Sequence, residues 1–383
     1  MEFDFLRPIQ GDVLETLETY SSQQFGSKVV FHTAEQFPDL TKITIAVIGV
    51  LENRGAETVN TEVDLVAIRK ALYSMFPGNW DASIADLGDI VAGDATTDTY
   101  FALRKVAATL IKNKVVPIII GGSQDLTYAL YRAYDELEQM VNLVAVDSKF
   151  DFGKEDGGAL AGSYLTKMII DEPNNLFNYC NIGYQTYYNS QEEIDLIEKL
   201  FFDAYRLGEV SHNIALAEPV FRDADIVSLD LTAVKSSDSG NFTNFAPNGF
   251  NGKEICALAR YAGISDKVSM FGIFNHNGSI QESALVAQII WYFIEGFHYR
   301  SNEYPFGTRD NYIKYIVPVE EEVLIFFKSD KTDRWWIEIP FVSNSNNKLK
   351  RNTLLPCSYE EYLSACNQEL PERWWKAQRK NTL

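Results

Sequence analysis

Long apolar runs are missing from this chain of 383 residues. None of its hydrophobic stretches reaches the roughly 20 residues that a helix needs to cross a bilayer. The segment from Met1 to Pro8 also lacks the basic start and the apolar core of a signal peptide. We therefore expect a cytoplasmic protein that is not inserted in a membrane.

Cysteines and positive charges are both scarce. The cysteines stand without CxxC spacing, which predicts reduced, buried thiols at Cys180, Cys256, Cys357 and Cys366. The chain has 34 Lys and Arg residues and 53 Asp and Glu residues, which gives a formal net charge of -19. Nucleic acid and anionic membrane surfaces repel such a chain, so we expect neither as a partner.

The sequence does have a regular alternation of apolar strands and amphipathic helices. Hydrophobic residues make up 46% of the chain, which is enough for a large core. Expected strands lie at 43–50, 116–120, 143–146, 178–183, 226–230 and 268–274. Expected helices lie at 63–76, 97–113, 124–137, 194–202, 253–261 and from 279 onward. Such alternation predicts a parallel sheet flanked by helices, as in a three-layer α/β/α fold.

Three of these strands run directly into polar residues. One ends in Gly121, Gly122 and Gln124, the next in Asp147 and Asp151, and the third in Asp230. In open α/β sheets, ligands bind beyond the carboxyl ends of the strands. We therefore expect these three strand ends to form one site.

The same three stretches resemble the ureohydrolase family, which comprises arginases, agmatinases and formimidoylglutamases. The family pattern is Gly-Gly-x-His, then Asp-x-His-x-Asp, then Ser-x-Asp-x-Asp, and its two His and four Asp hold two manganese ions. Here the blocks are Gly121 to Gln124, Asp147 to Asp151 and Ser228 to Thr232. The segment from Ile84 to Ile90 also matches the Asp-x-Gly-Asp segment of the family. The resemblance covers about residues 43 to 299 and implies the ureohydrolase (arginase-like) fold.

Several ligand positions depart from that pattern. By alignment with the family, Gln124 and Lys149 stand in the two His positions and Thr232 stands in place of the last Asp. Where the family has Glu-x-Asn-Pro, this chain has Asn-His-Asn-Gly, beginning at Asn275. Three of the six ligands remain, namely Asp147, Asp151 and Asp230.

The replacements change what the site can hold. Gln124 and Thr232 offer only neutral oxygens, which bind a hard cation weakly. The ammonium of Lys149 brings a positive charge to the place where a cation would lie, so we interpret it as a built-in counter-ion to the carboxylates. We therefore predict no metal ion in the site. The alternative is Mn2+ held by Asp147, Asp151 and Asp230.

Each replacement also has a simpler interpretation. Gln124 can start a helix, Thr232 can be a loop residue bonded to backbone, and Lys149 can point to solvent. His276 can be a new ligand or base, although we favour a surface histidine without a catalytic role. Residues 157–164 contain no His, so the histidine that the family often carries in its substrate loop is also absent.

Residues 318–383 have no recognised counterpart in the family, so we place a boundary there and assign 1–317 to the ureohydrolase-like domain. The sequence of this extension predicts a β-hairpin from 323–328 and 334–339, a loop at 344–352 and helices at 359–366 and 371–379. Its aromatic density suggests packing against the α/β body through Trp335, Trp336, Trp374 and Trp375. A partner-binding surface is the alternative.

The sequence supports three functional interpretations. We favour a non-catalytic pseudoenzyme with a structural or protein-interaction role, as a homo-oligomer or with a protein partner. The first alternative is a metal-dependent C–N hydrolase of a guanidino or formimino substrate, which would cleave non-peptide bonds in linear amidines. The second is a small-molecule sensor that uses the old pocket. No residue is assigned a catalytic role.

Overall fold

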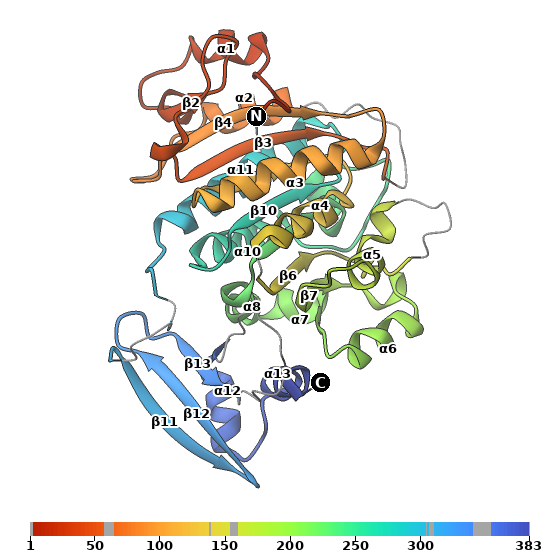
Figure 1. Cartoon of the computed structure of the whole chain (residues 1–383), viewed down its shortest axis with the longest axis vertical. Helices are drawn as coiled ribbons and strands as arrows, with labels where there is room; N and C mark the ends of the chain where they lie inside the picture. Colours follow the sequence, from red (N-terminus) through yellow and green to blue (C-terminus); the bar gives the residue numbers. More distant parts are fainter. Residues whose placement is uncertain are drawn as a thin grey trace.

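A mixed, mainly parallel sheet forms the centre of the molecule (Figure 1). This computed structural model describes residues 3–56, 65–137, 139–153, 160–303, 305, 310–339 and 354–382. In the described residues the sheet has ten strands. Their order is β1 (Leu6–Arg7), β4 (Ile84–Val91), β3 (Ile45–Leu51), β5 (Val116–Ile120), β10 (Met270–Phe274), β9 (Ile226–Asp230), β6 (Val141–Val146), β7 (Leu176–Tyr184) and β8 (Asp203–Arg206), with β2 (Val29–Phe31) also beside β4. The strands pair in parallel except for β1 with β4.

Helices cover both faces of this sheet and bury an apolar core on each. One face carries α1 (Gly11–Leu17), α2 (Val66–Ser74), α7 (Leu207–His212), α8 (Ala217–Asp223), α10 (Gly252–Ile264) and α11 (Ile280–His298). The other carries α3 (Thr96–Lys112), α4 (Leu126–Arg132), α5 (Tyr164–Ile170) and α6 (Gln191–Lys199). The short α9 (Ser236–Ser239) follows β9. The predicted three-layer fold is confirmed.

Two predicted helices differ from the observed ones. The expected helix at 124–137 is α4 followed by a tighter 3-10 turn, η3 (Ala133–Leu137). The helix expected at 194–202 begins earlier, because Ser190 and Glu193 form a reciprocal capping box at the start of α6. Residues 63–64 and the loop expected at 344–352 lie outside the described residues.

A second, antiparallel sheet follows near the C-terminus (Figure 1). Its strands are β11 (Tyr312–Val319), β12 (Glu322–Ser329), β13 (Trp335–Glu338) and β14 (Leu354–Cys357), and one face packs on α12 (Tyr359–Cys366) and α13 (Glu372–Thr382). The predicted hairpin is the β12–β13 pair. The boundary placed at 317/318 falls inside β11, because the strand already begins at Tyr312.

Only two of the four tryptophans meet the α/β body as expected. The guanidinium carbon of Arg222 lies 4.8 Å from the ring centre of Trp336. The ring centres of Trp375 and Phe201 are 5.6 Å apart. Trp335 and Trp374 instead lie in the core of the C-terminal sheet and its helices. That core forms because alternate residues of the strands face α12 and α13.

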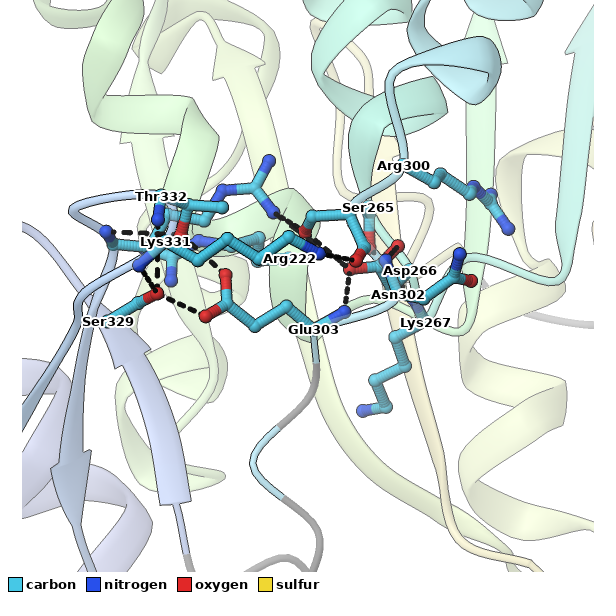
Figure 2. A network of polar contacts seen from close by, with 12 residues as sticks. Arg222, Ser265, Asp266, Lys267, Arg300, Asn302, Glu303, Ser329, Lys331 and Thr332 are labelled. Atoms are coloured by element: carbon cyan, nitrogen blue, oxygen red, sulfur yellow. Dashed lines mark hydrogen bonds and ion pairs between the residues drawn. The ribbon is translucent and has the colours of Figure 1, made fainter. Parts of the chain in front are cut away.

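Polar contacts also attach the C-terminal sheet to the body (Figure 2). Arg222 of α8 donates to the carbonyl oxygens of Trp335 at 3.0 Å and Cys357 at 2.9 Å. Glu303 accepts from Thr332 Oγ1, while its own backbone N–H donates to Asp266. These contacts are buried or half-buried, so the second sheet is held in one position on the body.

Candidate functional site

The four central strands, β5, β10, β9 and β6, end at the same edge of the sheet because they run parallel. The backbone N–H of Asn275, just after β10, donates to the carbonyl of Gly122, just after β5, at 2.7 Å. Gly122 also lets the residue after β3 lie close by, since a Cβ atom at position 122 would lie 1.9 Å from the carbonyl oxygen of Glu52. The strand ends are therefore locked together.

A cavity of about 170 Å³ opens at this edge. Six of the seven predicted site residues line it: Gln124, Lys149, Asp151, Asp230, Thr232 and Asn275. The seventh, Asp147, is 1% exposed, and its charge acts on Asp151. Side-chain amides supply most of the remaining polar lining, from Asn53, Asn241, Asn244 and Asn277. The structure therefore brings together the residues that the strand ends predicted.

Three buried carboxyl groups lie at the base of the cavity. Burial and the charge of Asp230 raise the pKa of Asp147 to about 7. Burial and the charge of Asp147 raise the pKa of Asp151 well above its usual range, and burial raises that of Asp230. The Oδ2 atoms of Asp147 and Asp151 are buried without a hydrogen-bond partner among the described residues. Such carboxyl groups need either protons or a nearby cation.

Lys149 supplies positive charge to this group. Its side chain lines the cavity, and its charge counteracts the raised pKa values of both Asp151 and Asp230. Lys149 is half-buried and lines the cavity, which favours the counter-ion interpretation over the alternative in which it points away to solvent. A salt-bridge distance to at least two of the carboxyl groups stays a prediction.

The other two replacements have defined local contacts. Gln124 is 1% exposed and its Nε2 atom lies 3.4 Å from the hydroxyl of Tyr164, to which it donates. The backbone N–H of Thr232 donates to Oδ1 of Asp230 at 2.7 Å. Gln124 precedes α4, which begins at Leu126. These contacts are compatible with both the structural and the functional interpretation.

Glu282 was not predicted as a site residue, and His276 was predicted to lie at the surface. Glu282 is fully buried, and its carboxylate accepts hydrogen bonds from the backbone and the side chain of Asn277. Burial raises its pKa to about 8. The His276 side chain is 2% exposed, with Nε2 lying 3.8 Å from Oε2 of Glu282 and 3.2 Å from Oγ of Ser283. Its side chain is therefore buried at the cavity wall.

This set of donors does not fit a pair of manganese ions. Such a centre needs anionic or imidazole ligands on both metals, held about 3.5–4 Å apart. The cavity is lined by two carboxyl groups and the ammonium-bearing Lys149, with Asp147 buried behind them. Its one histidine, His276, is already bonded to Ser283 and faces Glu282. No group of three or more His, Cys, Asp or Glu in the described part of the chain is arranged to hold a metal ion.

The family assignment follows from comparison with known proteins. A model of the arginase family matches residues 44–293. The chain belongs to the arginase family. Because the match includes all three strand ends, the predicted resemblance is confirmed.

Individual relatives are similar to the chain over part of their length. A formimidoylglutamase of Geobacillus thermodenitrificans is 31% identical over 166 residues, covering 42% of this chain and 48% of the relative, so the match spans about half of that protein. One from Staphylococcus carnosus is 22% identical over 273 residues, covering 67% and 86%.

Solved structures show the same fold. Trypanosoma cruzi formiminoglutamase with Mn2+ superposes with a TM-score of 0.62 at 19% identity, covering 69% of this chain and 97% of the other. Bacillus subtilis formimidoylglutamase gives 0.64 at 15% identity, covering 73% and 93%. At these identities the structural likeness supports the fold alone.

Two further findings bear on the composition-based expectations. No helix in the described ranges is long and apolar enough to span a membrane. The four cysteines are free thiols, and three are buried as expected, whereas Cys366 is exposed.

Proposed function

We propose that this arginase-family chain acts as a formimidoylglutamase-like hydrolase on a small formimino or guanidino compound, without a manganese pair. The observation that carries the proposal is the cavity at the ends of β5, β6, β9 and β10, with carboxyl groups at its base and amides on its walls. The similarity to formimidoylglutamases supports the substrate class. The sequence analysis gave a hydrolase of this substrate class as an alternative, but as a metal-dependent one, and the comparisons favour such a hydrolase over the pseudoenzyme.

The lining suits a cationic amidine that carries a polar tail. Asp151 and Asp230 can accept hydrogen bonds from amidine N–H groups, while Asn53 and Asn277 can donate to the tail. Asp151 lines the cavity and can accept a proton from water as the water adds to the amidine carbon, and the buried Asp147 behind it, with a pKa of about 7, can take up that proton. The C–N bond then breaks and the amine leaves with a proton.

A non-catalytic binding role is the second candidate, and Lys149 is the observation that favours it. Its ammonium already balances part of the carboxylate charge, so the site is stable without either metal or cationic substrate. In that case the cavity would bind its ligand without turnover. A protein partner, a homo-oligomer and a cytoplasmic location also stay proposals.

One assay separates these roles. Purified protein is incubated with N-formimino-L-glutamate, agmatine or L-arginine, with chelator or with Mn2+, and release of formamide or urea is measured beside calorimetric binding. We expect turnover of one compound that survives the chelator and is lost in Asp147→Asn but kept in the exposed control Asp195→Asn. Binding without turnover would support the second candidate, and absence of binding would refute both. Turnover that requires Mn2+ would refute the metal-independent part of the proposal.

A further inference from the structure

A second and larger cavity lies beside the central one, between α3, α4 and the start of α5. Its volume is about 510 Å³, which is in the range of small-molecule sites. We call it the side cavity. Tyr164 lines it, and the same tyrosine accepts the hydrogen bond from Gln124, which lines the central cavity. The two cavities therefore share a wall but have different linings.

Most charges around the side cavity are already paired. Arg132 forms an ion pair with Asp135 at 2.9 Å and donates to the carbonyls of Pro173 and Glu172. Lys167 forms an ion pair with Asp171 at 3.4 Å. These groups build the wall and have little capacity left for a ligand.

Arg104 differs from them. It lines the cavity from α3, where its guanidinium lies 5.7 Å from the ring centre of Phe101 and its charge counteracts the raised pKa of Asp135. Among the described residues it makes no hydrogen bond and no ion pair within 4 Å. Its Nε atom is buried without a partner. A buried, unpaired N–H is rare in a folded protein and points to a missing acceptor. Guanidinium groups pair best with planar anions such as carboxylates, through two parallel hydrogen bonds.

Aromatic rings form the wall next to Arg104. Tyr100 lies one turn before Arg104 on the same face of α3, and its ring centre is 6.1 Å from that of Tyr128 on α4. Both hydroxyls are already used, since Tyr100 donates to Asp125 and Tyr128 donates to Asp171. The two rings are therefore fixed and offer flat apolar surfaces to a ligand.

The carboxyl group of Asp125 also lines the cavity but does not oppose an anion there. It is 1% exposed and accepts the Tyr100 hydroxyl. Burial raises its pKa, which favours the neutral form.

We propose that the side cavity is a second binding site, for a small aromatic carboxylate whose acid group pairs with Arg104 and whose ring packs on Tyr100 and Tyr128. The unpaired guanidinium and the fixed rings each select one half of such a ligand. Because Tyr164 lines the side cavity and accepts the hydrogen bond from Gln124, a ligand bound here would touch a residue that holds Gln124 in the central site. The proposal is independent of the reaction proposed for the central cavity.

The test uses 2-naphthoate and its uncharged isostere 2-naphthamide on the full chain, by calorimetry and saturation-transfer NMR. We expect the acid to bind with a dissociation constant below about 1 mM and the amide to bind about tenfold more weakly. Arg104→Gln should reduce acid binding to the level of the amide. Lys105→Gln is the matched control, because Lys105 is the next residue, pairs with Glu136 and does not line the cavity.

A second variant guards against misfolding of the first. Thr97→Trp changes an exposed residue at the cavity wall and should block binding while Arg104 is kept. Thermal melts of both variants verify that they fold. Equal binding of acid and amide, unchanged acid binding in folded Arg104→Gln, or no acid binding at millimolar concentration would each overturn the proposal.

Discussion

The backbone N–H of Lys149 donates to Oδ1 of Asp147 at 2.9 Å. A carboxylate at the end of β6 thus fixes the backbone of the residue that follows two positions later. The Lys149 side chain then extends into the cavity, where its charge acts on Asp151 and Asp230. One strand end therefore supplies both the acidic groups and the cation that balances them.

Removing this cation should destabilise the fold most at neutral pH. We expect Lys149→Met to lose about 3 kcal/mol at pH 7, the lower end of the cost of breaking a buried pair, because Lys149 is only partly buried. The raised pKa values mean that the carboxyl groups favour the folded state when protonated, and that this contribution is lost as pH rises. Without Lys149 the folded state loses more stability as the carboxyl groups ionise. The destabilisation by Lys149→Met should therefore shrink as pH falls from about 7 toward the usual carboxyl pKa range near 4.

Thermal melts of parent and Lys149→Met across pH measure this effect. Lys235→Met is the control, because Lys235 forms a more exposed ion pair with Asp238 and should cost at most about 1 kcal/mol. A Lys149→Met protein as stable as the parent at pH 7 would show that the counter-ion hypothesis is wrong.

Metal binding gives an independent prediction for the same cavity. Protein purified in Mn2+ and then desalted should retain fewer than two manganese ions per chain, because Gln124, Lys149 and Thr232 supply no anionic or imidazole ligand. The triple variant Gln124→His, Lys149→His, Thr232→Asp should bind manganese more tightly than the parent, as measured by elemental analysis and calorimetry. Two bound manganese ions in the parent would contradict the prediction.

Arg222 should contribute strongly to holding the C-terminal sheet on the body. Arg222→Met would leave two buried carbonyl oxygens, of Trp335 and Cys357, without their donors. Unsatisfied buried groups cost about 1–3 kcal/mol each, so we expect a loss of about 2–6 kcal/mol in the free energy of unfolding. Arg260→Met, which removes a more exposed ion pair with Glu295, should cost less than about 1 kcal/mol. Denaturant titration compares the two; equal losses would contradict the role given to Arg222.

The sequence predicted the central strands and the site because those features are local. A buried parallel strand is a continuous apolar run, and polar residues at its end mark the sheet edge. The expectation that the ends of these strands lie side by side came from the family resemblance, since no local pattern encodes strand order. The family match therefore contributed the part that the residues alone did not.

The features that were missed depend on contacts between distant segments. Glu282 fits a capping box by spacing, yet its carboxylate bonds to Asn277 because the loop after β10 folds back onto α11. The side cavity arises where α3 and α4 meet, and there the Nε atom of Arg104 is buried without a hydrogen-bond partner among the described residues. Likewise, Trp335 and Trp374 face their own small sheet instead of the body. Periodicity and spacing contain no information on such pairings.

The last prediction concerns Asp225, at the opposite end of β9 from the candidate site. It is 2% exposed, accepts from the backbone N–H of Asn142 at 2.8 Å, and lies 3.2 Å from the ammonium of Lys267. Burial raises its pKa to about 6 despite the charge of Lys267. The protonated form therefore favours folding, and this contribution, present below about pH 4, is lost as pH rises through about 6. The raised pKa corresponds to about 3 kcal/mol.

In Asp225→Asn the side chain stays neutral, so the variant should lose stability less steeply than the parent between pH 4 and 7, as measured by urea titration at each pH. The exposed Asp195→Asn should keep the slope of the parent. An unchanged slope in Asp225→Asn would show that Lys267 and the Asn142 N–H already stabilise the ionised carboxylate fully.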